Sequence, residues 1–466
     1  MKSTSNNDNQ IESVFRTKSL TKNGKCVSVL SGVMLQQIST KIFSVKMDLA
    51  LPVSRIWLLV LISSLQRLEK TGALDSPLLG SAHLGNDSYK YHEDAHLSAR
   101  ELISKYGYRG ETHKVTTNDG YILEMHRITG PKSNPKAEGK PVIFVMHGLL
   151  CSSVDWIISG PKKGLGFMLA DAGYDVWLGN ARGNTYSRGH KKYSTIDKQY
   201  WMFSWHEQGT EDLPAMIDYI TRNTGNERIF YAAHSQGTTA YFVMASEKPK
   251  YNDKIIAMFG MAPVAYLEHM RSPFLQVLTR IDKVVTNVME VLGWYEFKPI
   301  DGLIKKVATI ACQEENWTQD ICLNVMFLIA GFGSDQMNRT LLPAILGHTP
   351  AGSSSRQLIH YSQLFKSNKF RKYDHGALRN YIIYKRMTPP SYDLSKVTTP
   401  VIISYGLNDW LAHPKDVRRL TAQLPNVYAE LKVPNPNFGH LDHLWGIDAP
   451  RYVYSKLIAL LNHFRS

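Results

Sequence analysis

Short apolar runs bounded by turn residues recur along the chain from about residue 115. Six of them are predicted to be strands: 141–146, 175–178, 228–231, 255–259, 401–405 and 428–433. Continuous apolar runs, rather than alternating ones, indicate strands that are buried on both faces. Helical spacing appears between the runs, at 212–221 and again in a last helix from about Pro450. This alternation predicts an α/β fold with a mostly parallel central sheet that is flanked by helices.

The alternation breaks between about 265 and 395, where the pattern is long and largely helical. We expect this stretch to be an inserted cap or lid rather than another part of the sheet. The core would then have two parts, the first over 90–264 and the second over 396–466.

The beginning of the chain has a different composition. Residues 1–46 are polar with no apolar period, which predicts a disordered leader or an alternative start upstream of Met47. In residues 47–70, Arg55 precedes the apolar run 56–62, and small residues follow it. This order is typical of a secretory signal peptide, and the run is far below the roughly 20 residues that span a bilayer. A buried helix and a short membrane anchor are the alternatives.

Composition and charge exclude several classes of protein. Of the 466 residues, 43% are hydrophobic and 20% are charged, which argues against both a disordered chain and a multi-span membrane protein. The net charge of +14 indicates a basic solvated surface, with weak attraction to anionic lipid as the sharper alternative. A role in binding nucleic acid has only this net charge behind it, and we do not expect one.

Three Asn-x-Ser/Thr triplets are candidate glycosylation sites, at Asn86, Asn316 and Asn338. Together with the signal-like segment they favour the secretory pathway and a secreted or lysosomal protein. Four cysteines are too few for a disulfide scaffold. Cys312 and Cys322 are close enough in sequence to form one bridge, with two free thiols as the alternative.

The most informative segment runs from 228 to 245 and reads as a strand, a sharp turn and a helix. Ser235 lies at the turn, with small residues two positions away on either side, Ala233 and Gly237. Small neighbours let a strand and a helix pass closely while the serine hydroxyl projects above the sheet. The usual sequence pattern of such a turn is Gly-x-Ser-x-Gly, and here Ala233 replaces the first glycine. We predict that Ser235 is a nucleophile.

A serine nucleophile needs a histidine base and a carboxylate that orients the base. Asp409 follows the strand 401–405, and we favour it over Asp416, which begins a helix. His440 lies in a glycine-containing loop after the strand 428–433, and we favour it over His443. The order Ser, Asp, His along the chain is that of the α/β-hydrolase fold.

The tetrahedral intermediate of such a reaction needs hydrogen-bond donors for its oxyanion. One expected donor is the backbone N–H of Gln236, directly after the nucleophile. The second is the backbone N–H of Leu149, in the loop 147–150 that follows the first buried strand.

Taken together, these segments resemble the acid lipase family of gastric and lysosomal lipases. The resemblance covers roughly residues 95–465, and its motifs are specific and in the right order. They are 115–123, His147-Gly-Leu-Leu150, 177–185, His234-Ser-Gln-Gly237, Asn408-Asp-Trp410 and His440-Leu-Asp442.

The resemblance implies an α/β-hydrolase fold with a lid, a triad of Ser235, Asp409 and His440, and an oxyanion hole from Leu149 and Gln236. It also implies a Cys312–Cys322 disulfide in the cap, and no metal or organic cofactor.

We therefore expect a carboxylic ester hydrolase that acts on neutral lipids, either triacylglycerol or steryl ester, at an oil–water or membrane interface. No obligate protein partner is evident in the sequence. The alternative from another class is a non-catalytic lipid carrier on a lipase fold, which predicts the loss of a triad residue.

Overall fold

The structure is a computed structural model, and it describes residues 93–273, 275–277, 279–280, 293–297 and 335–465. All of them belong to one compact unit, Ser88–Ser466. Several predicted features lie outside the described residues: the leader 1–46, the signal-like segment 47–70, Asn86, Asn316, Cys312 and Cys322.

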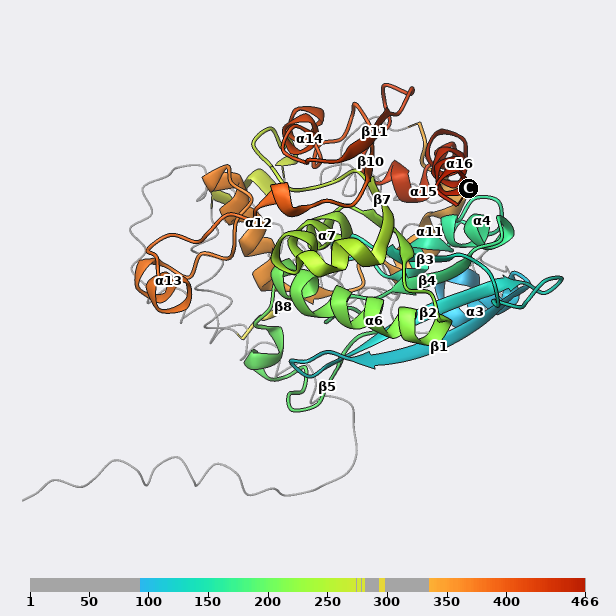
Figure 1. Cartoon of the computed structure of the whole chain (residues 1–466), viewed down its shortest axis with the longest axis horizontal. Helices are drawn as coiled ribbons and strands as arrows, with labels where there is room; N and C mark the ends of the chain where they lie inside the picture. The colour runs from blue at the N-terminus through green and yellow to red at the C-terminus, as the bar shows by residue number, and fades with distance from the viewer. Residues whose placement is uncertain (1–92, 274, 278, 281–292, 298–334, 466) are drawn as a thin grey trace, which may run out of the picture. The chain divides into compact units, whose positions relative to one another are not determined.

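A large mixed sheet forms the centre of this unit (Figure 1). Within the described residues it has nine strands, in the order β1-β2-β4-β3-β6-β7-β10-β11, with β5 beside β2. The strands are β1 (Tyr108–Thr116), β2 (Tyr121–Pro131), β3 (Val142–Met146), β4 (Asp175–Gly179), β5 (Gly189–His190), β6 (Ile229–His234), β7 (Ile255–Met261), β10 (Val401–Tyr405) and β11 (Val427–Lys432). Along this order, the neighbouring strands from β4 to β11 pair in parallel, whereas β2 pairs antiparallel with β1, β4 and β5. The predicted fold class is confirmed.

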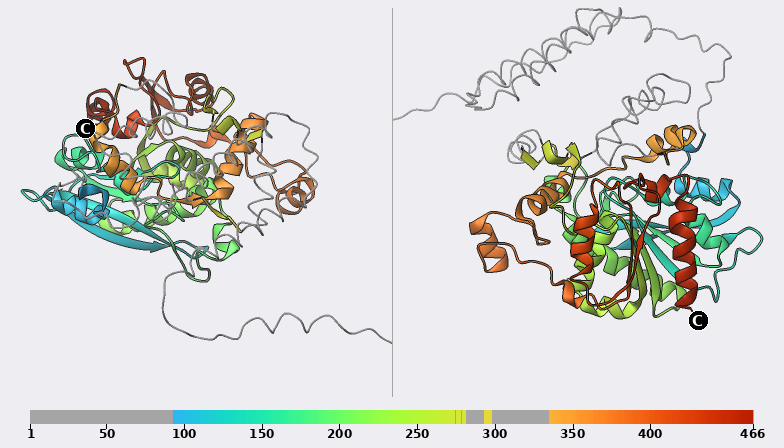
Figure 2. Two further views of the ribbon diagram at one scale, coloured as in Figure 1. Left: turned by 180° about the vertical axis from the view of Figure 1, so that it is seen from behind. Right: turned by 90° about the horizontal axis from the view of Figure 1, so that it is seen from above.

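Helices cover both faces of the sheet, as the two further views show (Figure 2). The α-helices whose bounds lie in the described residues are α3 (Ala99–Lys105), α4 (Leu165–Asp171), α5 (Trp205–Glu207), α6 (Leu213–Thr224), α7 (Gln236–Glu247), α11 (Leu342–His348), α12 (Ser355–Ser367), α13 (Ala377–Tyr384), α14 (Pro414–Thr421), α15 (Asp442–Trp445) and α16 (Ser455–His463). None of the helices in the described ranges is long and apolar enough to cross a membrane.

The strand β3 shows why the apolar runs are continuous. Phe144 and Met146 pack into the same core cluster as α6, α7 and α14, whereas Ile143 and Val145 pack into a second cluster with α4 and α16. A strand between two helical layers must present apolar side chains to both, so every position is apolar.

The last strand differs from the expectation that it is buried on both faces. In β11 the residues alternate between half-buried and exposed, and Glu430 and Lys432 are the exposed charged positions. The strand is at the end of the sheet order, and charged side chains on an edge strand discourage pairing with another molecule.

The segment 265–395, expected to be a cap, is described only in part. Its described residues contain α11, α12, α13 and a short antiparallel pair, β8 (Glu296–Phe297) with β9 (Ser353–Ser354). These described residues add no strand to the large sheet. Leu364 of α12 and Ile345 of α11 pack into the two core clusters, so both helices are fixed to the core.

Candidate active site

Ser235 lies at the turn between β6 and α7, with φ 50° and ψ −117°. A non-glycine residue with positive φ is strained and persists only where its surroundings hold it. Here the Ser235 amide donates to the carbonyl of Met261 at 3.0 Å, and the Ser235 carbonyl accepts from the amide of Thr238 at 2.9 Å. The Thr238 hydroxyl donates to the same carbonyl at 2.6 Å. The serine is therefore held at a sharp corner above the sheet.

Glycine is required at position 237 because β3 ends against the start of α7. A Cβ on Gly237 would lie 2.7 Å from the carbonyl oxygen of Met146 and 2.8 Å from that of His147. The same hypothetical atom would lie 3.1 Å from the methyl group of Ala233. The alanine that replaces the usual first glycine therefore fits because Gly237 carries no side chain.

Three side chains from distant segments meet at this corner. His440 Nε2 lies 2.8 Å from the Oγ of Ser235, and His440 Nδ1 lies 2.9 Å and 3.1 Å from the two carboxylate oxygens of Asp409. The Asp409 carboxylate favours the tautomer in which Nδ1 donates, which leaves Nε2 free to accept the hydroxyl proton. The structure thus brings together the three residues that the sequence singled out.

Asp409 is buried and held as an anion. Its Oδ1 accepts from the backbone amides of Leu411 at 2.8 Å and Ala412 at 2.7 Å. Burial raises the pKa of Asp409, but the attraction and hydrogen bond of His440, together with the hydrogen bond from the Leu411 amide, outweigh it and hold this pKa below its usual range. A buried carboxylate with these partners orients the imidazole of His440.

The backbone of His440 is fixed by the residue before the serine. His234 Nε2 lies 3.0 Å from the carbonyl oxygen of His440. Burial is the main cause that lowers the pKa of His234 well below its usual range, so the ring is neutral and donates this hydrogen bond. The two loops that carry the serine and the histidine are therefore joined directly.

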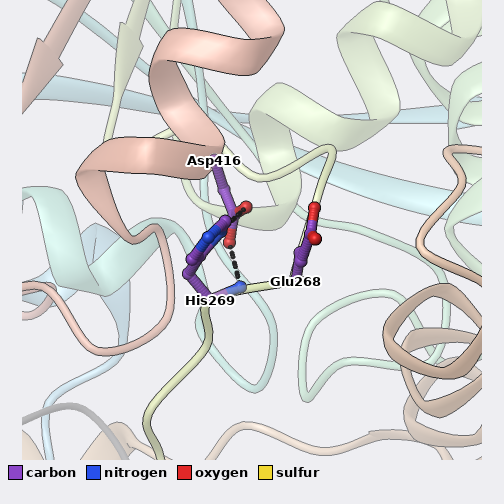
Figure 3. A group of neighbouring side chains, drawn as sticks. All are labelled: Glu268, His269 and Asp416. Carbon is purple, nitrogen blue, oxygen red and sulfur yellow. Dashed lines mark hydrogen bonds and ion pairs between the residues drawn. The ribbon is translucent and has the colours of Figure 1, made fainter.

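The rival acid, Asp416, is engaged elsewhere. It lies in the first turn of α14, where it accepts from both the backbone amide and the Nδ1 of His269 at 2.8 Å (Figure 3). Glu268 lies beside them, since a carboxylate oxygen of Glu268, a carboxylate oxygen of Asp416 and a ring nitrogen of His269 all lie within 4.8 Å of one another. The Glu268 carboxylate also forms an ion pair with Arg419 at 3.0 Å. These contacts clamp the loop after β7 to α14.

The rival histidine, His443, lies in α15, directly after the loop that carries His440. Its Nδ1 lies 3.2 Å from the carbonyl oxygen of Gly439, and its ring meets Phe438 edge-on at 4.9 Å between centroids. Burial lowers the pKa of His443 to about 4. It is thus a buried neutral histidine that supports the loop carrying His440.

The two expected oxyanion donors lie on either side of Ser235. Gln236 is the first residue of α7, where backbone amides have no acceptor within the helix. On the other side, a Cβ on Gly148 would lie 3.2 Å from the Cβ of Ser235, which places the loop 147–150 against the serine. Leu149 is the next residue of that loop and is half-buried.

A buried polar network supports this loop. His147 Nε2 accepts from the amide of Ala181 at 3.0 Å and from the side chain of Asn184 at 3.2 Å. Asn184 in turn donates to Asn180 at 2.9 Å. Burial lowers the pKa of His147 to about 4 and so keeps it a neutral acceptor. Residues of the motif 177–185 therefore support the loop 147–150 through their hydrogen bonds to His147.

Sequence reasoning missed a group of three buried glutamines beside the serine. The Gln236 side chain donates to Gln208 at 3.0 Å and to Gln357 at 2.6 Å, and Gln208 donates to Gln357 at 3.1 Å. Gln208 lies in a widened helical turn (Gln208–Asp212) and Gln357 in α12. No local pattern marks them, because their meeting depends on three segments that are far apart in the chain.

Of the remaining predicted residues, Asn338 is described. It is half-buried, and its side chain accepts from the amide of Thr340 at 3.1 Å. Cys151, for which the sequence predicted no role, is a buried free thiol, and burial is the main cause that raises its pKa well above the usual value. Such a thiol is a packing residue rather than a nucleophile.

The serine lies at a turn between a strand and a helix of a mostly parallel sheet, and it is hydrogen-bonded to a histidine that a buried aspartate orients. This arrangement defines the class of the α/β-hydrolases. A family model described as the alpha/beta hydrolase fold matches residues 141–447, and one described as a partial alpha/beta-hydrolase lipase region matches residues 99–160. A suspected lipase from Sulfolobus solfataricus has a similar solved structure, with a TM-score of 0.51 and 16% identity. That match covers 76% of this chain and 94% of the other, and at this identity it supports the fold alone.

Curated relatives are closer in sequence. Lipase 3 of Drosophila melanogaster is 43% identical over 364 residues, which are 78% of this chain and 92% of the relative. Gastric triacylglycerol lipase of Mus musculus is 40% identical, covering 79% and 92%. Human lysosomal acid lipase/cholesteryl ester hydrolase is 36% identical, covering 80% and 92%. The chain belongs to the acid lipase family, and it is a carboxylic ester hydrolase.

Proposed function

We propose that this protein hydrolyses the ester bonds of neutral lipids, triacylglycerol or steryl ester, with Ser235, His440 and Asp409 as its catalytic triad. The observation that carries the proposal is the pair of contacts made by His440, 2.8 Å to the Ser235 hydroxyl and 2.9 Å to Asp409. The relatives named for triacylglycerol and cholesteryl ester support the choice of substrates.

In the acylation step the Oγ of Ser235 attacks the ester carbonyl carbon and passes its proton to His440 Nε2. The carbonyl oxygen becomes an oxyanion, which the N–H groups of Gln236 and Leu149 stabilise. Collapse of this intermediate breaks the bond to the alcohol oxygen, which takes the proton from His440. The acyl group is then esterified to Ser235.

In the deacylation step His440 takes a proton from water as the water oxygen attacks the acyl carbon. A second tetrahedral intermediate collapses, Ser235 leaves and recovers the proton, and the fatty acid is released. Asp409 stays ionised throughout, since its role is to orient His440 and to stabilise its protonated form.

We also propose that the protein works in a secretory compartment, either outside the cell or in the lysosome. The signal-like segment 47–70 and the triplets at Asn86, Asn316 and Asn338 support this proposal. A Cys312–Cys322 bridge in the cap and a lid over the site remain part of the same proposal.

The test is hydrolysis of a panel of lipid esters by the purified protein, with Ser235→Ala as the control. We expect release of fatty acid from triolein or cholesteryl oleate by the wild-type protein, and loss of nearly all of it in the variant. A wild-type protein that binds these lipids without hydrolysing any of them would instead favour the lipid carrier.

A further inference from the structure

The helix α13 has an inverted pattern of buried and exposed side chains. Its apolar residues face solvent: Leu378 is 79% exposed and Ile382 is 68% exposed, and Tyr381 and Ile383 are exposed as well. Its one fully buried residue is polar, because Asn380 is only 1% exposed. A surface helix normally shows the opposite arrangement, with the apolar stripe toward the core.

Polar contacts on the inner side hold α13 in this orientation. Asn380 donates to a carboxylate oxygen of Asp374 at 2.8 Å and to the carbonyl of Met387 at 3.0 Å, and it accepts from the amide of His375 at 2.9 Å. Asp374 and Gln363 of α12 exchange two hydrogen bonds, at 2.8 Å and 2.9 Å. The exposed apolar face is thus built by a connected set of bonds that ends on the core-packed helix α12.

The helix projects from the body of the fold. Figures 1 and 2 show α13 in orange beyond α12, on the side away from α4 and α16, in every view. Met387, just after the helix, is also exposed and extends the apolar patch. We call the exposed side chains of Leu378, Tyr381, Ile382, Ile383 and Met387 the α13 patch. Five large exposed apolar side chains within ten residues of the chain indicate a binding surface.

Charges at the patch indicate what it binds. Arg379, Lys385 and Arg386 are exposed around it, and the segment 376–387 contains no acidic residue. An exposed apolar helix face with cations at its margin is the composition that enters the boundary between lipid headgroups and acyl chains. The proposed reaction releases fatty acid carboxylates, which would make such a lipid surface negative.

We propose that the α13 patch docks the enzyme on a lipid surface, with Leu378 and Ile382 inserted and the cations on anionic amphiphiles. The choice of partner rests on the proposed function, since a lipase must meet its substrate at such a surface. Two lipid-facing apolar side chains and three cations make the binding both hydrophobic and dependent on salt.

The experiment measures binding apart from catalysis. The full chain carrying Ser235→Ala, which forms no product, is mixed with phosphatidylcholine vesicles with and without oleate and separated by flotation. We expect Leu378→Ser with Ile382→Ser to lower partition to the vesicles about 100-fold. Ile196→Ser, at an isolated position that is 91% exposed, is the matched control and should bind like the parent.

A charge series separates the two components of binding. Oleate should increase partition of the parent protein to the vesicles. We expect this increase to be about fivefold smaller in each of the single variants Arg379→Gln, Lys385→Gln and Arg386→Gln, with little change in partition to vesicles without oleate. Equal binding by the Leu378→Ser, Ile382→Ser protein and its parent would overturn the proposal. So would a parent protein that is a dimer in solution and becomes a monomer through the same two substitutions, because the patch would then bind a second copy.

The proposed function is tested separately on a water-soluble ester. With active Ser235, the patch variants should hydrolyse p-nitrophenyl butyrate at the wild-type rate and lose activity only on emulsified triolein. A wild-type protein that cleaves neither ester would refute the hydrolase mechanism, while the flotation result would still decide whether α13 binds lipid.

Discussion

At the scale of single residues, the two acids after β10 show how environment assigns a role. Asp409 and Asp416 are both buried, and each contacts a histidine. The histidine of Asp409 reaches the Ser235 hydroxyl, whereas that of Asp416 lies on the loop after β7. Position in the loop after a strand favoured Asp409 from the sequence alone, and the partner of Asp416 was not foreseen because His269 is distant in the chain.

Exchange of each acid for its amide separates these roles. We predict that Asp409→Asn lowers kcat about 10⁴-fold, because the amide no longer favours the productive tautomer of His440. Asp416→Asn should keep kcat within tenfold of wild type and lower the free energy of unfolding by about 1–3 kcal/mol, since it weakens bonds to His269. Steady-state kinetics and urea denaturation measure the two effects. Similar kcat values for both variants would contradict the assignment.

The buried histidine His443 gives a prediction for how the stability of the protein depends on pH. Burial lowers the pKa of His443 to about 4 in the folded protein, while an unfolded histidine titrates near about 6.5. A depressed pKa means that the unfolded chain binds the proton more readily. The stability that neutral His443 contributes is therefore complete above about pH 6.5 and is lost as the pH falls toward about 4.

In His443→Gln this acid-sensitive contribution is absent. Relative to the variant, the wild-type protein should lose about 2 kcal/mol of unfolding free energy between pH 7 and pH 5. Urea denaturation of both proteins at the two pH values measures the difference. A stability difference that is the same at pH 5 and pH 7 would show that His443 does not titrate in this way.

At the scale of elements, the sequence predicted those whose burial is uniform. The runs that became β3, β4, β6, β7 and β10 are mainly apolar and buried at nearly every position, so length and flanking turns identified them. The elbow was predictable for a similar reason, because Gly237 and Ala233 are local requirements. The glutamine group was not, since Gln208, Gln236 and Gln357 are ordinary residues until three elements bring them together.

That group couples α12 to the start of α7. We predict that Gln357→Leu lowers kcat for a soluble ester about tenfold with little change in KM, because the amides of Gln208 and Gln236 lose their shared acceptor and the N–H of Gln236 is less well placed. The matched control is Gln363→Leu on the same helix, which faces Asp374 and should leave kcat unchanged. Equal kcat values for Gln357→Leu and wild type would refute the coupling.

At the scale of the whole molecule, alternation of strands and helices predicted a sheet between two helical layers. It did not predict the antiparallel hairpin of β1 and β2. Most residues of β1 are half-buried or exposed, so this strand gives a weaker apolar signal than the buried β2 beside it. Nor did it predict the α13 patch, because a helix with its apolar side outward has the same sequence pattern as one with that side inward. Only the contacts of Asn380 distinguish the two.

The signal-like segment gives a prediction about the mature chain. Expressed in cells that secrete it, the protein should begin downstream of Ser64, because the apolar run 56–62 is followed by the small residues that signal cleavage requires. N-terminal sequencing of the secreted protein measures this directly. A mature chain that still begins at Met1 would refute the signal peptide.

The most direct test of the central claim is to treat the full-length protein with a fluorophosphonate and locate the adduct by mass spectrometry. We predict one adduct per chain, on the Oγ of Ser235, formed rapidly by the wild type and far more slowly by His440→Ala. An unlabelled wild-type protein, or a label on another residue, would contradict the account.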